Sequence, residues 1–366
     1  MSPHQHHHPI QSLSLSTKLS SPYPWTSLPL IVSAPMRVMS GPSLAVAVSS
    51  AGGLGFIGPG LSPDSTAIDL EECVKILDDK SSDSKDVLPV GVGFQLWNGD
   101  LKVACEAVGK YKPAAAWLFA PKEGQREINE WIKNLRGVSK KTKIWVQVGA
   151  LKEIEGILQG EEEYKPDVIV VQGFEAGGHG RTKDGAPLMT LLPEVLDLLG
   201  ERNTIPIFAA GGIADGRGVS AALCLGAAGV VMGTRFLGSK EARIKRGYQD
   251  AVLEARDGGA NTVKTHLYNH LRGTWGWPEE EWTPRTIVNK SWEEENGGVE
   301  FEELKKRHDD AVTKGDKAWG KEEGRTATYA GMGVGLVKEV KGAGEIVEDV
   351  RKEAKEILKR LGGNNW

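Results

Sequence analysis

The feature that most constrains the fold of this chain is a recurring unit, in which a short apolar run is followed by a turn and a helix-like stretch. Such runs, bounded by glycine and polar turn residues, are typical of strands buried on both faces. The predicted strands cover Pro29–Ser33, Leu54–Ile57, Val87–Phe94, Ala114–Phe119, Ile144–Val148, Val168–Val171, Ile205–Ala209 and Gly229–Met232. Eight strands alternating with helices at short spacing predict an α/β fold, a closed (β/α)8 TIM barrel. The alternative, an open doubly wound sheet, would carry a GxGxxG turn after its first strand, and this chain has none there.

Changes in composition divide the 366 residues into four parts. Residues 1–24, rich in His, Ser and Pro, predict a disordered tail, and residues 25–240 contain the barrel. Residues 241–324 are rich in Trp, Glu and Lys, so we expect a small helical addition that either packs on the barrel or covers its mouth as a lid. Residues 325–366 end in an amphipathic helix over Ile346–Leu361, which predicts that the chain returns to the barrel.

The charge and the cysteine content exclude several classes of function. A net charge of −4 offers no basic surface for nucleic acid, and no apolar run is long enough to span a membrane. The cysteines, Cys73, Cys105 and Cys224, are far apart, which argues against a disulfide framework or a zinc site and favours a reducing compartment. We therefore expect a cytoplasmic protein without a bound metal.

A glycine-rich loop follows the sixth predicted strand and contains one acidic residue, Glu175, and one histidine, His179. Because α/β enzymes place their chemistry at the carboxyl ends of buried strands, His179 is a candidate base. A simpler interpretation is a tight turn with a solvated histidine. Glu175 either orients His179 or only solvates the loop.

Two successive strand ends further along the chain predict an anion site. The seventh predicted strand runs into Gly211-Gly212 and the eighth into Gly233-Thr234. Backbone amides at two such ends, together with a hydroxyl group, form a nest for a phosphate. In TIM barrels the loops after the seventh and eighth strands are the usual phosphate site. This second element favours the functional interpretation of the His179 loop.

Five motifs occur in order after residue 25. They are VSAPM at 32–36, AGGLG at 51–55, QGFEAGGHG at 172–180, AAGGIADGRG at 209–218 and VMGTRF at 231–236. Together they resemble the nitronate monooxygenase family, formerly called 2-nitropropane dioxygenases. The resemblance implies an FMN-containing TIM barrel that oxidises a small nitronate or nitroalkane substrate with molecular oxygen.

The resemblance also implies roles for individual positions, with His179 as the active-site base. The residues expected to contact FMN are Ala34, Pro35, Met36, Gly93, Gln147, Gln172, Gly173, Gly177, Gly178, Ala210, Gly211, Gly212, Met232, Gly233 and Thr234. Two positions depart from the family pattern, since Gly93 and Met332 stand where many relatives have Asn and Gln. The contact of the Asn side chain with the flavin is then either lost or taken over by Gln95.

The expected chemistry follows from these residues. A neutral imidazole can remove the acidic α-proton of a nitroalkane, and the flavin performs the redox step. Two other functions fit the same pattern. One is an NAD(P)H-dependent quinone or enoyl reductase on the same flavin barrel, and the other is a flavin-free barrel that binds a phosphorylated metabolite as a lyase or isomerase.

Overall fold

Eight parallel strands close into a barrel in the computed structural model, which describes residues 21–78, 86–201, 203–320 and 323–362. The strands are β1 (Leu30–Ser33), β2 (Leu54–Ile57), β3 (Leu88–Gln95), β4 (Pro113–Phe119), β5 (Lys143–Val148), β6 (Val168–Gln172), β8 (Ile207–Ala210) and β9 (Gly229–Met232). They follow one another around the barrel in this order, and β9 pairs with β1 to close it. The predicted (β/α)8 TIM barrel is confirmed, whereas the predicted tail lies almost wholly outside the described residues.

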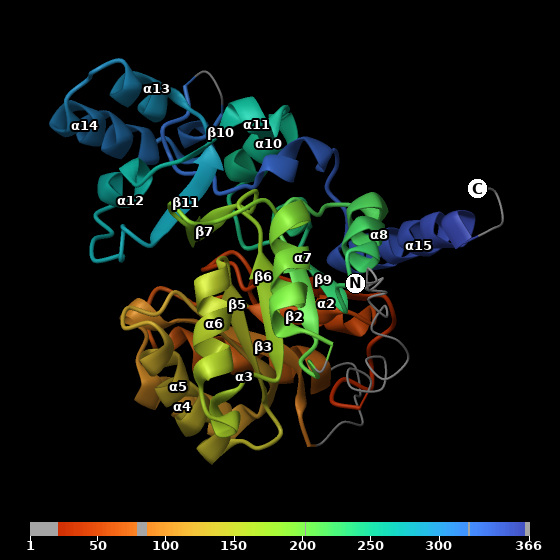
Figure 1. Cartoon of the computed structure of the whole chain (residues 1–366). Helices are drawn as coiled ribbons and strands as arrows, with labels where there is room; N and C mark the ends of the chain where they lie inside the picture. The colour runs from red at the N-terminus through yellow and green to blue at the C-terminus, as the bar shows by residue number, and fades with distance from the viewer. Residues whose placement is uncertain (1–20, 79–85, 202, 321–322, 363–366) are drawn as a thin grey trace, which may run out of the picture.

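Helices cover the outside of the barrel (Figure 1). They are α2 (Pro42–Ser50), α3 (Ser65–Asp78), α4 (Leu101–Tyr111), α5 (Gln125–Val138), α6 (Leu151–Gln159), α7 (Leu188–Leu199) and α8 (Gly216–Cys224). Their apolar faces pack on the outer side of the strands in one continuous core. No helix in the described part of the chain combines the length and the apolarity needed to cross a bilayer.

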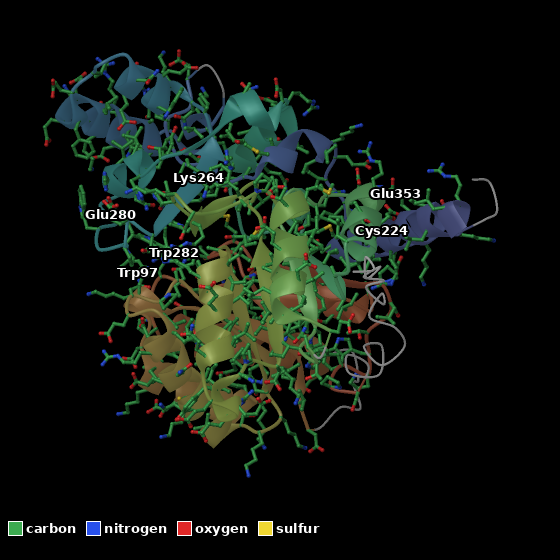
Figure 2. All side chains as sticks on the ribbon, in the orientation of Figure 1. Trp97, Cys224, Lys264, Glu280, Trp282 and Glu353 are labelled. Atoms are coloured by element: carbon green, nitrogen blue, oxygen red, sulfur yellow. The ribbon has the colours of Figure 1, made fainter. Side chains whose placement is uncertain are left out.

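The eighth helical position is filled from the far end of the chain. The helix after β9, α9 (Thr234–Leu237), is a single turn, and α15 (Ala343–Gly362) packs against α8 and α2 in its place (Figure 1). The Arg351 guanidinium donates to the carbonyl oxygens of Ala51 at 3.0 Å and Gly52 at 2.7 Å. Glu353, labelled in Figure 2, accepts a hydrogen bond from Gly216 N at 2.7 Å and so caps α8. The chain therefore returns to the barrel, as its amphipathic pattern predicts.

Aromatic side chains fill the interior of the barrel. Trp117 and Trp145 stack with their centroids 5.9 Å apart, and Phe208 and Phe56 pack on Trp145 at 4.7 and 5.3 Å. Glycines on neighbouring strands make room for these rings, since a Cβ at Gly91 would lie 2.3 Å from the Phe56 ring. The interior is thus a packed core, and a ligand can enter only at one end of the barrel.

The segment after β9 builds a separate layer on top of the barrel (Figure 1). Its helices are α10 (Arg246–Glu254), α11 (Gly258–Asn261), α12 (Leu267–Leu271), α13 (Lys290–Asn296) and α14 (Phe301–Val312). Besides these helices the addition contains two strands, β10 (Thr262–Lys264) and β11 (Trp282–Ile287), which form an antiparallel sheet with β7 (Gly178–Arg181). Strand β7 belongs to the glycine-rich loop after β6, so the sheet joins that loop to the addition.

Candidate active site

A cavity of about 400 Å³ lies at the carboxyl ends of the barrel strands. Its floor comes from residues at or just after the strand ends, including Gln95, Gln147 and Gln172. Residues of the added segment, including Arg272 and Trp277, complete the wall. A cavity of this size in this position is typical of a small-molecule or cofactor site in a TIM barrel.

Most of the residues predicted from the sequence line this cavity. They are Ala34, Pro35, Met36, Gln147, Gln172, Gly177, Gly178, His179, Ala210, Gly211, Gly212, Gly233 and Thr234. Gly93, Gly173 and Met232 lie one layer behind the lining. A Cβ at Gly93 would lie 2.3 Å from Pro35 Cβ, and one at Gly173 would lie 2.3 Å from Glu175 Oε2. The Met232 carbonyl accepts from Ala34 N at 3.0 Å, so these three residues shape the loops that form the cavity.

Four backbone N–H groups at two strand ends form the nest that the glycine pattern predicts. Gly211 and Gly212 have φ values of +103° and +70°, which glycine adopts without the cost that a Cβ would add. The amides of Gly211, Gly212, Gly233 and Thr234 have no acceptor among the described residues. Thr234 Oγ1 accepts from Gly331 N at 2.9 Å and keeps its own proton for a further bond. These groups can bind a phosphate.

Gln147 presents an unpartnered donor at the cavity. Its Oε1 accepts a hydrogen bond from Trp117 Nε1 at 3.2 Å, which orients the amide. Its Nε2 is buried and has no partner among the described residues, although a buried N–H group is costly when it is unpaired. An acceptor atom on a bound ring would satisfy this group, and an isoalloxazine carries such atoms on its polar edge. The donor set therefore fits a flavin.

His179 lies on β7, and its ring stacks on Trp277 with the centroids 3.6 Å apart and the planes 7° from parallel. Two residues further along, buried Arg181 is paired with Asp184 at 2.8 Å and with Glu281, which ties β7 to the added segment. Burial is the largest cause that holds the pKa of His179 well below its ordinary value of 6.5, and the positive charge of Arg272 adds to it. The imidazole is therefore neutral at physiological pH and can accept a proton.

Glu175 has a role that the sequence does not reveal. Both of its carboxylate oxygens accept from Leu188 N, at 2.9 and 3.0 Å, so Glu175 caps the N-terminus of α7. No hydrogen bond or ion pair joins Glu175 to His179 among the described residues. Glu175 therefore does not orient His179. Its bond to Leu188 N instead holds the glycine-rich loop in place.

Two arginines at the cavity give it a positive charge. Arg37 is half-buried and lines the cavity, with no acidic partner among the described residues, while Arg272 lies exposed at its mouth. Burial, and then repulsion from Arg272, lower the pKa of Arg37. Next to it, Val38 has a φ of +66°, which is rare for a β-branched residue and marks a strained loop. A bound anion would offset the mutual repulsion of the two guanidinium groups.

Sequence reasoning missed several residues around His179. Arg37 directly follows the predicted Ala34–Met36 loop, so its position was an available signal. Asn269, Arg272 and Tyr329 come from segments without a regular sequence pattern. Only the folded chain brings Arg272 and Tyr329 to the cavity and places Asn269 against His179.

The two tryptophans at 275 and 277 have different positions. The Trp277 side chain is 6% exposed and lines the cavity, whereas Trp275 is 59% exposed and stacks on His270 with the centroids 4.3 Å apart. Of this pair, only Trp277 faces the site.

Comparisons with known proteins agree with this geometry. The family model described as nitronate monooxygenase matches residues 138–353. The nitronate monooxygenase npaC of Metarhizium robertsii is 54% identical over 343 residues, covering 93% of this chain and 95% of that protein. The nitronate monooxygenase of Neurospora crassa is 34% identical over an alignment of 369 residues that covers 94% of each chain. Among solved structures, FabK from Thermotoga maritima superposes with a TM-score of 0.68 at 26% identity, covering 94% of this chain and 98% of that one.

Proposed function

The chain belongs to the nitronate monooxygenase family, and we propose that it oxidises alkyl nitronates with FMN as cofactor and molecular oxygen as electron acceptor. In this proposal His179 is the base that converts a neutral nitroalkane into its nitronate. The observation that carries the proposal is the convergence of three features on one cavity. They are a neutral imidazole, a set of unpartnered hydrogen-bond donors and a positive charge without a counter-ion.

The positive charge supports a nitronate as the substrate. A nitronate is the anion that remains when a nitroalkane loses its α-proton, and its charge resides largely on two oxygen atoms. Arg37 lines the cavity and has no carboxylate partner among the described residues, so it is available to such an anion. The guanidinium group offers several N–H donors in a fixed plane, which suits the pair of oxygens.

The lowered pKa of His179 keeps its ring in the unprotonated form that a base requires. Because burial and the neighbouring positive charges disfavour the imidazolium, the ring is unprotonated across the physiological range. A positioned base of this kind contributes about 10²–10⁴-fold to the rate of a proton transfer. The stacked Trp277 ring covers one face of the imidazole and keeps water from it.

Separate groups of residues would hold the two parts of the cofactor. The amides of Gly211, Gly212, Gly233 and Thr234 would bind the phosphate, and Gln147 Nε2 would donate to the ring. The single phosphate nest favours FMN, since a dinucleotide needs a second. When bound, the flavin supplies the transfer of electrons from the nitronate to oxygen.

The barrel and the added segment have different roles in this proposal. The described residues of 25–240 and 325–366 would bind the cofactor, and those of 241–324 would close the mouth of the cavity and shape the substrate pocket. This division is supported by the lining residues Arg272, Thr274 and Trp277, which all come from the added segment.

An absorbance spectrum of the purified protein tests the proposal. We expect a yellow protein whose flavin is bleached when a nitronate is added without oxygen, and we expect FMN to be released on denaturation. Bleaching by NADH but not by nitronate would show a quinone or enoyl reductase instead. A colourless protein that does not bind added FMN would favour a flavin-free lyase or isomerase, and release of FAD would contradict the assignment of the nest.

A further inference from the structure

Asn269 contacts His179 directly. It lies on α12, is completely buried, and places its Nδ2 atom 3.1 Å from His179 Nε2. The His179 ring is held between this contact and the stacked ring of Trp277. The state of the imidazole in the resting enzyme thus depends on how the Asn269 amide is oriented.

The neighbours of Asn269 determine that orientation. Its Oδ1 atom accepts from Tyr329 Oη at 3.2 Å and from Arg272 Nη2 at 3.4 Å. A guanidinium group can only donate, so the amide oxygen must face Arg272. Arg272 is itself anchored by hydrogen bonds to the Tyr268 carbonyl, at 3.1 Å, and to Tyr329 Oη. Turning the amide over would place its NH₂ group against the N–H groups of Arg272.

The orientation of the amide selects the tautomer of His179. The Nδ2 group of an amide is a donor only, so His179 Nε2 must be the unprotonated nitrogen that accepts its hydrogen bond. A neutral imidazole then carries its proton on Nδ1. This Nδ1 atom has no partner among the described residues and is not among their buried unpartnered atoms, so it keeps accessible surface while His179 lines the cavity.

We propose that Asn269 is a positioning residue that holds His179 as the Nδ1–H tautomer, so that the resting site offers a donor to a nitronate at once, whereas His179 must release its hydrogen bond to Asn269 before it acts as the base for a nitroalkane. The second half of this statement rests on the function proposed above. The anionic oxygens of a nitronate accept from Nδ1–H, and no bond has to be broken first. The cationic side chains near the ring, Arg37, Lys264 and Arg272, also favour an anion.

A neutral nitroalkane must first lose its α-proton to a base. Its α-carbon C–H bond must break, the proton must pass to an unprotonated ring nitrogen, and the electron pair must form the C=N bond of the nitronate. The unprotonated nitrogen is Nε2, where the Asn269 N–H already occupies the lone pair. Breaking one neutral hydrogen bond first costs about a 2- to 10-fold loss of rate. Preformed nitronates should therefore be turned over faster than nitroalkanes.

The tautomer can be read directly in the full-length holoenzyme. Long-range ¹H–¹⁵N spectra of protein labelled with ¹⁵N-histidine distinguish a protonated from an unprotonated ring nitrogen, and the His179→Asn variant identifies the His179 signals. We expect a proton on Nδ1 and none on Nε2. A His179 ring that carries its proton on Nε2 overturns the proposal, whatever the enzyme oxidises.

Asn269→Asp supplies the second measurement. A carboxylate keeps the contact with Arg272 and, unlike the amide, accepts from Nε2–H, so His179 should switch tautomer and present an unprotonated Nδ1 to the cavity. The rate ratio of nitroalkane to nitronate should rise by about 2- to 10-fold, and the acid limb of the nitroalkane rate should move to higher pH. An unchanged ratio in a folded variant with the switched tautomer would overturn the link between tautomer and substrate.

The matched control is Asn289→Asp. Asn289 is also a buried asparagine of the added segment, but it contacts Tyr268 and caps α13 instead of touching His179. We expect this variant to keep the wild-type tautomer and rate ratio, and a shift in both would show that the effect at 269 is indirect. If nitronate is not oxidised at all while His179 is the Nδ1–H tautomer, the proposed function fails and the role of Asn269 in selecting the tautomer stands.

Discussion

Replacing Gln147 by Met should weaken flavin binding while leaving the cofactor-free protein about as stable as before. Met is unbranched and similar in length, so it fills the same space without a polar end. The two polar atoms of the Gln147 amide differ in their hydrogen bonding. Oε1 is bonded to Trp117 Nε1 at 3.2 Å, whereas Nε2 is buried without a partner among the described residues.

The expected magnitude follows from counting these groups. Without cofactor, Gln147→Met removes one unsatisfied buried donor but deprives Trp117 Nε1 of its acceptor. Each unsatisfied buried polar group costs about 1–3 kcal/mol, so the two changes oppose each other and the free energy of unfolding should change by at most about 2 kcal/mol. With FMN bound, the variant leaves a buried acceptor of the cofactor unpaired. The loss of about 1–3 kcal/mol corresponds to a dissociation constant about 5- to 150-fold higher.

Titration of cofactor-free protein with FMN, followed by the quenching of flavin fluorescence, measures the dissociation constant. Chemical denaturation of the same preparations measures stability. Gln125→Met is the matched control, because Gln125 lies on α5, bonds Asn129 at 2.8 Å and does not line the cavity. An unchanged affinity in the Gln147 variant, or an equal loss of affinity in both variants, would refute the assignment of Nε2 as a cofactor ligand.

Three further predictions concern the substrate site and the scaffold. His179→Asn should slow the turnover of neutral nitroalkanes by about 10²–10⁴-fold and that of preformed nitronates much less. Because the pKa of His179 is lowered, the wild-type rate with nitroalkanes should be level above pH 6.5 and fall only at lower pH. A fall in rate that begins at or above pH 6.5 would contradict the effect of burial on this pKa. Trp277→Ala should raise KM more for long nitronates than for short ones, whereas Trp275→Ala should leave KM unchanged for both. Equal changes of KM for all chain lengths in the Trp277 variant, together with a lower Tm, would indicate that Trp277 has a packing role alone. Gly137 lies in α5, and a Cβ added there would have no heavy atom within 4 Å. Gly137→Ala should therefore raise the free energy of unfolding by about 0.5–1 kcal/mol, and a decrease measured by denaturant titration would contradict this prediction.

The strands and the anion nest could be predicted because their determinants are local. A strand buried on both faces needs an uninterrupted apolar run, and each run in the sequence corresponds to one strand of the barrel within a few residues. The positive φ angles of Gly211 and Gly212 likewise follow from the residue type at a strand end. The family motifs coincide with these positions, so 12 of the 15 residues expected to contact the cofactor line the cavity, together with His179.

The other features of the fold and of the candidate site depend on contacts between distant parts of the chain. Strand β7 has the sequence GHGR, which shows no apolar alternation, and it is a strand because β11, about a hundred residues later, pairs with it. The short helix α9 leaves a place on the barrel that α15 fills from the far end of the chain. In the same way, Asn269 and Tyr329 acquire their roles only where folding places them beside His179. Local patterns determine which residues can form a strand or a nest, whereas the tautomer and the pKa of a histidine depend on neighbours that only tertiary packing supplies.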